Sequence, residues 1–263
     1  MGKIKTFIQY TKDFVKHGEY RYILSSIRYV LTGKTTRKTR HYKSSLGKFI
    51  VRKGTLDFQF ANYAYEWNVK RFVYQHLNDY NVFLDVGANI GTYSIIPAIE
   101  GLKVFAFEPV KSNYDALVTN VDLNNYNDLV VTFPLALGKE NTSANFTLDL
   151  VNTGASHLTE YTNIAEIIEN PEFEDIEIVR FDDIFKELNI GSGDKVFMKI
   201  DVEGMEPDVL IGATNFIKNH ENLLVIIETI HSGVDSLKEL LSSLAEFEFI
   251  EVDELNMAAL KIK

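Results

Sequence analysis

Four acidic side chains each close an apolar run that predicts a β-strand. They are Asp85 after "VFL", Glu108 after "VFAF", Asp201 after "VFMKI" and Glu228 after "LLVII". Because the carboxyl ends of parallel strands meet at one edge of a sheet, we expect these carboxylates to line a common crevice. A carboxylate in such a crevice can accept hydrogen bonds from hydroxyls, attract a cationic group or remove a proton. The pattern therefore predicts a binding and catalytic site at one sheet edge.

The segment "DVGANIG" after the first of these strands predicts a ligand-binding turn. Gly87 can adopt a positive φ and lets backbone approach a ligand, while Gly91 opens the next helix and permits close packing. The glycines are four apart, unlike the G-x-G-x-x-G turn that cradles a pyrophosphate, and an acid before the turn would repel a phosphate. We therefore expect Asp85, Gly87, Ala88, Asn89 and Gly91 to bind S-adenosylmethionine, a cationic nucleoside without phosphate.

Glu108 strengthens the prediction of a nucleoside site. It lies about 20 residues beyond the turn, where this kind of fold places an acid for the ribose hydroxyls. Pro109 follows it and precedes the next predicted helix. A glycine turn alone would indicate only an ordinary loop, whereas turn, interval and strand-end acid together indicate a cofactor site.

Asp201 and two histidines are the candidate catalytic residues. Methyl transfer to a hydroxyl requires that the acceptor be aligned and its proton removed. Asp201 ends a strand at the edge that carries the cofactor turn, and His231 follows the next strand. His157 lies in a weakly patterned excursion over 140–175 that would close over the cofactor. Alternatively, either histidine is an ordinary loop residue that is exposed to solvent.

Three further acids, Glu203, Glu206 and Glu228, are candidate substrate contacts. The first two follow Asp201 within one turn. Carboxylates this close could raise one another's pKa and supply a base, or bind a divalent metal ion through their oxygens. The alternative for Glu203 and Glu206 is structural, because acids stabilise the N-terminus of a helix. The sequence does not decide whether a metal is bound.

Several blocks of the chain resemble the FkbM-type family of S-adenosylmethionine-dependent methyltransferases. They are "FLDVGANIGTYS", "VFAFEPVKSNYDALVTNV", "ALG" at 136–138, "RFDDIF" and "MKIDVEGMEPDVLIGA", and they lie within roughly residues 60–230. The last block is the most specific. The resemblance implies a class I methyltransferase fold and S-adenosylmethionine as cofactor, with Ala136 among its contacts. It also implies O-methylation of a hydroxyl on a sugar, glycan or natural product.

The alternation of strands and helices predicts an α/β fold. It indicates a mostly parallel, Rossmann-like sheet with helices on both faces, as the resemblance also implies. "FEFIEVD" and "MAALKIK" would add a closing antiparallel hairpin. Before this series we expect a hairpin over 46–60 and a helix over about 62–78. The main strands are expected at 82–86, 103–108, 129–137, 195–201 and 222–228, and the helices at 91–100, 111–124, 205–218 and 235–244.

The first fifth of the chain differs in charge from the rest. Residues 1–53 hold 14 of the 27 Lys and Arg side chains but only two acids, Asp13 and Glu19, in a chain with net charge −10. Two helical patterns here carry an apolar face beside the basic cluster "KTTRKTRHYK". We predict a basic amphipathic helical extension, 1–45, and a methyltransferase domain, 46–263. The extension would make a peripheral membrane contact, or pack on the domain or a second subunit of a homo-oligomer.

Other features narrow the function. There is no cysteine, no apolar run of the roughly 18 residues that span a bilayer and no signal-peptide pattern. We therefore expect a cytoplasmic protein, membrane-associated if the extension binds lipid, with a small-molecule or glycan acceptor. A nucleic-acid methyltransferase is a second hypothesis, which the acidic domain and the missing Asn-Pro-Pro-Tyr-like tetrapeptide disfavour. A third is a non-catalytic adaptor with a vestigial cofactor site.

Overall fold

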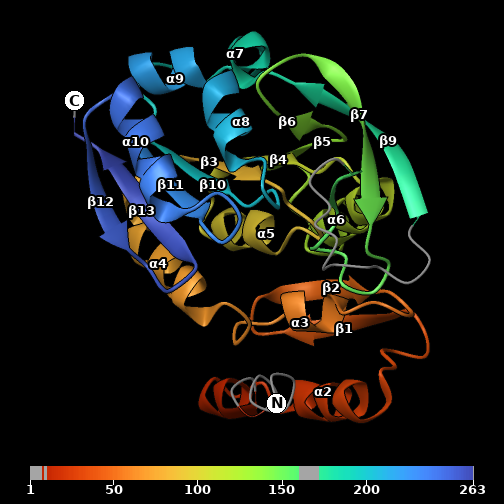
Figure 1. Cartoon of the computed structure of the whole chain (residues 1–263). Helices are drawn as coiled ribbons and strands as arrows, with labels where there is room; N and C mark the ends of the chain where they lie inside the picture. Colours follow the sequence, from red (N-terminus) through yellow and green to blue (C-terminus); the bar gives the residue numbers. More distant parts are fainter. Residues whose placement is uncertain (1–7, 9–10, 160–171, 263) are drawn as a thin grey trace.

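The chain folds around a seven-stranded sheet in the order β12-β13-β11-β10-β3-β4-β5 (Figure 1). The computed structural model describes residue 8 and residues 11–159 and 172–262, and the structural statements below concern these residues. The strands of this sheet are β3 (Val82–Val86), β4 (Lys103–Phe107), β5 (Val130–Phe133), β10 (Val196–Ile200), β11 (Leu223–Glu228), β12 (Phe247–Glu251) and β13 (Asn256–Lys261).

The sheet is mostly parallel, and its central strands are buried on both faces. Every residue of β3 and of β10 is buried, which explains why their sequences are apolar except for Asp85 and Lys199. β13 runs antiparallel to both β11 and β12. The predicted closing hairpin is thereby confirmed. Parallel pairing places Asp85 of β3 opposite Lys199 of β10, so both strands end at the same edge.

Helices cover both faces of the sheet, as predicted. Alternate residues of the strands face two apolar cores, so that Phe83 joins one core and Leu84 the other. One core is completed by α4 (Trp67–His76), α5 (Thr92–Ile99) and α6 (Lys111–Leu123). The other is completed by α7 (Phe181–Ile184), α8 (Glu206–Gly212), α9 (Thr214–Asn219) and α10 (Val234–Leu244). Two short 3-10 helices, η1 (Leu77–Asp79) and η3 (Phe185–Leu188), adjoin α4 and α7.

The weakly patterned excursion forms a second sheet. Its order is β6-β9-β7-β8, from β6 (Ala136–Leu137), β7 (Thr142–Leu148), β8 (His157–Leu158) and β9 (Glu172–Val179). Part of the excursion lies outside the described residues. The predicted strand 129–137 is therefore wrong as one element, because Pro134 separates β5 from β6 and the two belong to different sheets.

The N-terminal part contains α2 (Arg21–Thr32), β1 (Arg40–Ser44), β2 (Gly47–Val51) and α3 (Asp57–Phe60). In Figure 1, α2 lies beyond the β1–β2 hairpin, away from the main sheet. The hairpin predicted over 46–60 is wrong in position, since β1 pairs with β2 from Arg40↔Val51 to Ser44↔Gly47. The predicted domain boundary after residue 45 falls in the turn of this hairpin.

Two predicted helices are shorter than expected, each for a local reason. The helix over 62–78 begins only at Trp67, because the Asn62 side chain accepts hydrogen bonds from the amides of Ala64 and Tyr65 and holds them in a turn. The helix over 205–218 divides into α8 and α9. A Cβ atom on Gly212, at the end of α8, would lie 1.9 Å from a backbone carbonyl oxygen.

Candidate active site

A cavity opens at the carboxyl ends of β3, β4, β10 and β11, where the sequence places its strand-end acids. Glu108, Asp201 and Glu228 line this cavity. Asp85 does not line it, because its side chain is fully buried and its Oδ2 accepts a hydrogen bond of 2.5 Å from Ser94 Oγ. Burial raises the pKa of Asp85 to about 6. Asp85 therefore supports the turn from inside the sheet.

The turn after β3 has the conformation that its glycines predict. Gly87 has φ +84°, and a Cβ atom there would lie 1.8 Å from the carbonyl oxygen of Asp201, so only glycine fits between the two strand ends. Gly91 has φ +86° and is pressed against a leucine of α6. Gly87, Ala88 and Asn89 line the cavity, and Gly91 stands behind it at the start of α5.

Glu108 joins this turn to the end of β4. Its Oε2 accepts a hydrogen bond of 2.7 Å from the amide of Asn89, and its Oε1 accepts one of 2.9 Å from the amide of Val110. Burial raises the pKa of Glu108 to about 7, although both amide hydrogen bonds act to lower it. Pro109 and Ala136 line the cavity beside it. These residues form one compact end of the cavity.

Arg52, directly after β2, ties the N-terminal part to this end of the cavity. Its guanidinium makes a bidentate ion pair with the fully buried Asp57, at 2.7 and 2.8 Å. It also donates hydrogen bonds to Asn113 Oδ1 at 3.0 Å and to Thr153 Oγ1 at 3.2 Å. Asn113 and Thr153 both line the cavity. Arg52 thus connects the end of the N-terminal hairpin with the nucleoside end of the cavity.

Asp201 forms an ion pair with a lysine inside the sheet. Lys199 Nζ lies 2.8 Å from Asp201 Oδ2, and the lysine side chain is 5% exposed against 28% for the aspartate. Burial acts to lower the pKa of Lys199, but Asp201 and Asp85 together raise it above its usual value. Asp201 thus faces the cavity as the partner of a buried cation.

A second buried lysine stands at the same end of the cavity. The side chain of Lys70 is fully buried, and its Nζ donates a hydrogen bond to the carbonyl oxygen of Tyr65 and lies 5.0 Å from the ring centre of Tyr93. The Tyr93 hydroxyl donates in turn to Glu66 Oε2 at 3.0 Å. Burial lowers the pKa of Lys70 to about 8. All of these residues and Lys199 line the cavity.

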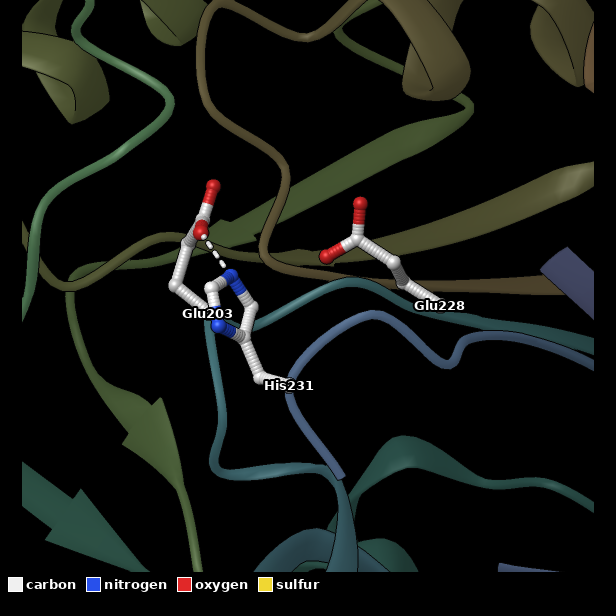
Figure 2. A group of neighbouring side chains, drawn as sticks. All are labelled: Glu203, Glu228 and His231. Atoms are coloured by element: carbon white, nitrogen blue, oxygen red, sulfur yellow. Dashed lines mark hydrogen bonds and ion pairs between the residues drawn. The ribbon is translucent and has the colours of Figure 1, made fainter. Parts of the chain in front are cut away.

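Glu203, Glu228 and His231 form a cluster at the ends of β10 and β11 (Figure 2). His231 Nε2 lies 3.0 Å from Glu203 Oε2, and one ligand atom from each of the three residues lies within 4.8 Å of the others. Burial, with the charges of Asp201 and Glu203, raises the pKa of Glu228 to about 9. The donor set suits a divalent metal ion, so metal binding stays a prediction. His231 itself is exposed and does not line the cavity.

Two predicted site residues lie away from the cavity. Glu206 is buried, and its carboxylate accepts hydrogen bonds from the amides of Val202 and Gly204 and from the hydroxyl of Ser232. The contacts of Glu206 therefore support a structural role at the start of α8. His157 is also buried, with its Nδ1 2.9 Å from the carbonyl oxygen of Ala155. Neither residue lines the cavity, so direct contact with a substrate does not follow from this geometry.

Several residues that line the cavity were not predicted from the sequence. The excursion contributes Asn152, Thr153, Gly154 and Ser156 instead of His157. One missed residue, Lys199, carries a signal, because a lysine inside "VFMKI" interrupts an otherwise apolar buried strand. Other lining residues that the sequence did not single out include Phe60, Glu66, Lys70, Thr92, Tyr93 and Asn113.

Counted along the chain, the seven strands of the main sheet have the order 3-2-1-4-5-7-6, with the seventh antiparallel. This order, together with a glycine turn after the first strand and an acid at the end of the second, defines the class I methyltransferase fold. A family model, the methyltransferase FkbM domain, matches residues 85–251. The chain therefore belongs to the FkbM methyltransferase family.

The chain is similar to one curated relative and to several solved structures. The hexuronic acid methyltransferase AglP of Haloferax volcanii is 29% identical over 192 residues, 73% of either chain. The crystal structure of methyltransferase FkbM from Methylobacillus flagellatus KT has a TM-score of 0.47 and 18% identity, over 69% of this chain and 44% of that one. The tRNA (uracil-54, C5)-methyltransferase of Pyrococcus abyssi, in complex with S-adenosyl-L-homocysteine, has a TM-score of 0.44 and 11% identity, over 85% and 43%. Both TM-scores are below 0.5, so the fold rests on the strand order.

Proposed function

We propose that this chain is an S-adenosylmethionine-dependent O-methyltransferase that acts on a hydroxyl of a sugar, glycan or natural product. The observation that carries the proposal is the division of the cavity into two chemically different ends. Glu108 and the glycine turn form one end, and Asp201 and Glu203 form the other, where His231 is hydrogen-bonded to Glu203 from outside the cavity lining. Family membership supports methyl transfer, and the likeness to AglP favours a sugar acid within this acceptor class.

The residues of the first end fit the cofactor. The Glu108 carboxylate accepts hydrogen bonds from two backbone amides and one from the Asn113 side chain, which leaves acceptor capacity for a ribose hydroxyl. No phosphate-cradling turn is present in the described part of the cavity, which suits a nucleoside without phosphate. When bound, S-adenosylmethionine supplies a methyl group on a sulfonium that is ready for displacement.

The charges between the two ends fit the amino-acid part of the cofactor. Lys70 and Lys199 are buried cations of the cavity wall, and Glu66 and Asp201 are anions beside them. A zwitterion with one carboxylate and one ammonium group matches such alternating charges, because each group meets an opposite partner in a poorly hydrated place. We assign the carboxylate to Lys70, whose ammonium has only a backbone carbonyl as its hydrogen-bond partner among those resolved here.

The second end can accept the proton of a hydroxyl. If His231 Nε2–H donates to Glu203, Nδ1 is the unprotonated nitrogen, and the carboxylate stabilises the imidazolium that forms when a proton is taken up. Because its pKa is raised, Glu228 is neutral at pH 7 and can donate a hydrogen bond to an acceptor oxygen. Asp201, paired with Lys199, contributes negative charge without having to be the base.

A transfer assay over a panel of acceptors tests the proposal. Purified protein is incubated with S-adenosylmethionine labelled in its methyl group and with hexuronic acid oligosaccharides, neutral oligosaccharides and total RNA. We expect label in a sugar acceptor, most of all in those with hexuronic acid, and none in RNA. Label in RNA alone would favour the nucleic-acid hypothesis. No transfer to any acceptor by protein that also fails to bind the cofactor would favour the adaptor hypothesis.

A further inference from the structure

The N-terminal helices present large apolar side chains to solvent. On α2, Tyr20 at its N-cap is 61% exposed, Leu24 is 75% exposed and Leu31 is 77% exposed. Spacings of four and seven residues place these three on one face of the helix. Ile8 and Val15, on the helical turns before α2, are each 49% exposed. We call these five residues the apolar stripe.

The stripe is not the face that packs on the rest of the protein. Tyr22 and Ser26, on the other side of α2, are buried, and the Tyr22 ring stacks on Tyr42 of β1 at 6.1 Å between centres. Phe14 is buried beside Tyr22. Val15, the next residue along the chain, is exposed. Docking on its own domain uses aromatic residues and leaves the stripe uncovered.

The exposed charges of the N-terminal part are cationic. Among the described residues of 8–53, the exposed charged side chains are all basic: Lys12, Lys16, Lys34, Arg37, Lys38, Arg40, Lys43, Lys48 and Lys53. The only two acids of this stretch, Asp13 and Glu19, are buried. An apolar stripe with a purely cationic surround has the chemistry of a surface that binds anionic lipid, because the apolar side chains enter the acyl boundary while the cations meet headgroups.

We propose that the apolar stripe and its basic surround dock this protein on an anionic membrane surface. Among the described residues, no helix is long and apolar enough to cross a bilayer. The rest of the chain is acidic, so an anionic surface would attract the N-terminal part and repel the remainder, which fixes one orientation. This docking does not depend on the proposed reaction.

The orientation matters for the cavity. α2 packs beside α3, and Phe60 at the end of α3 lines the cavity. A docked α2 would hold the cavity close to the membrane surface. An acceptor sugar carried on a lipid would then reach the cavity from the surface to which the enzyme is bound.

Vesicle flotation of the full-length protein tests this docking. The probes are phosphatidylcholine vesicles with and without phosphatidylglycerol. We expect wild-type protein to float with the anionic vesicles only, and to be released by high salt. The double variant L24E/L31E should lose at least about tenfold in vesicle partitioning. It puts charges in place of the two alkyl groups that would enter the membrane. The charge variant K38E/R40E should lose binding to anionic vesicles as well.

The matched control is V118E/L255E, which places the same two acids at exposed apolar positions of the methyltransferase domain, 39% and 45% exposed in the wild type. It should float like the wild type. Equal flotation of L24E/L31E and wild type would overturn the proposal, as would no flotation of wild-type protein. A wild-type dimer in size-exclusion chromatography that L24E/L31E converts to monomer, without flotation of either, would assign the stripe to a second copy of the chain instead.

Discussion

The amide nitrogen of Asn89 lies 2.7 Å from Glu108 Oε2, so the turn after β3 and the end of β4 share a hydrogen bond. Asn89 itself has a positive φ of 48°. The acid that is proposed to bind the ribose therefore also fixes the turn. Loss of the carboxylate should weaken cofactor binding twice, because it removes the ribose contact and also loosens the turn.

Glu108→Ala should weaken binding of S-adenosylhomocysteine by about 10- to 100-fold, the effect of losing hydrogen bonds to a charged acceptor. Isothermal titration calorimetry measures it. Glu108→Gln keeps one acceptor oxygen and should lose less. Wild-type affinity in the alanine variant would show that the nucleoside lies elsewhere.

Lys70→Met should weaken binding of S-adenosylhomocysteine but leave that of 5′-methylthioadenosine unchanged, because the second ligand has no carboxylate or ammonium group. Titration of both ligands against both proteins forms a double-mutant cycle. A similar loss for the two ligands would mean that Lys70 supports the fold of the cavity and does not meet the carboxylate.

His231→Ala should lower kcat by roughly 100- to 10,000-fold, the range for removal of a general base, while the affinity for S-adenosylhomocysteine stays at the wild-type level. Glu203→Gln should cause a smaller loss, because it removes only the partner of the imidazolium. His157→Ala serves as the matched histidine control and should retain its kcat. If His157→Ala were the impaired variant, the base would be misassigned.

The raised pKa of Glu228 predicts how stability changes with pH. The unfolded carboxyl titrates near pH 4.3, whereas the folded one titrates near pH 9, so the folded state holds the extra proton between these values. Stability from this group is complete below about pH 4 and is lost as the pH rises through 9. Glu228→Gln removes the titration. Its Tm should therefore exceed that of wild type increasingly between pH 5 and 9, and parallel Tm curves would refute the shift.

Arg52→Met should destabilise the fold by about 3 to 5 kcal/mol, since it leaves the buried Asp57 carboxylate unpaired. Urea unfolding measures the change. The exposed pair Lys111–Asp115 is the control, and Lys111→Ala should cost less than about 1 kcal/mol. A double variant Arg52→Met, Asp57→Leu should recover much of the loss. Equal losses of unfolding free energy in Arg52→Met and Lys111→Ala would show that Arg52 does not hold the N-terminal part on the domain.

The sequence predicts the main sheet well because its strands are continuous buried apolar runs with distinct turns. It also predicts that Glu108, Asp201 and Glu228 meet, since parallel strands end at one edge. Lys70 and Glu66 could not be predicted as cavity residues, because only tertiary packing brings α4 and the segment before α4 to the cavity. Glu206 was predicted as a substrate contact because the sequence cannot distinguish an acid that faces a ligand from one that accepts hydrogen bonds within its own turn.

The position of the N-terminal hairpin shows a different limit. Two asparagine side chains fix β2 against α6: the buried Asn120 accepts from the Ile50 amide at 2.6 Å, and Asn124 accepts from the Lys48 amide at 2.9 Å. These partners are about 70 residues apart in sequence. Local alternation of apolar residues cannot reveal such a pairing, so the expected hairpin was displaced along the chain.

The alkali stability of the transferred methyl group tests the central claim most directly. A hexuronic acid oligosaccharide offers hydroxyls and a carboxylate, and the Glu203–His231 pair is needed only for a hydroxyl, because a carboxylate has no proton to lose at neutral pH. Product labelled from S-adenosylmethionine is treated with alkali, and the label that stays on the sugar is counted. The account predicts an alkali-stable methyl ether whose formation requires His231. Label released as methanol, equally in wild type and His231→Ala, would contradict it and place the methyl group on the carboxylate.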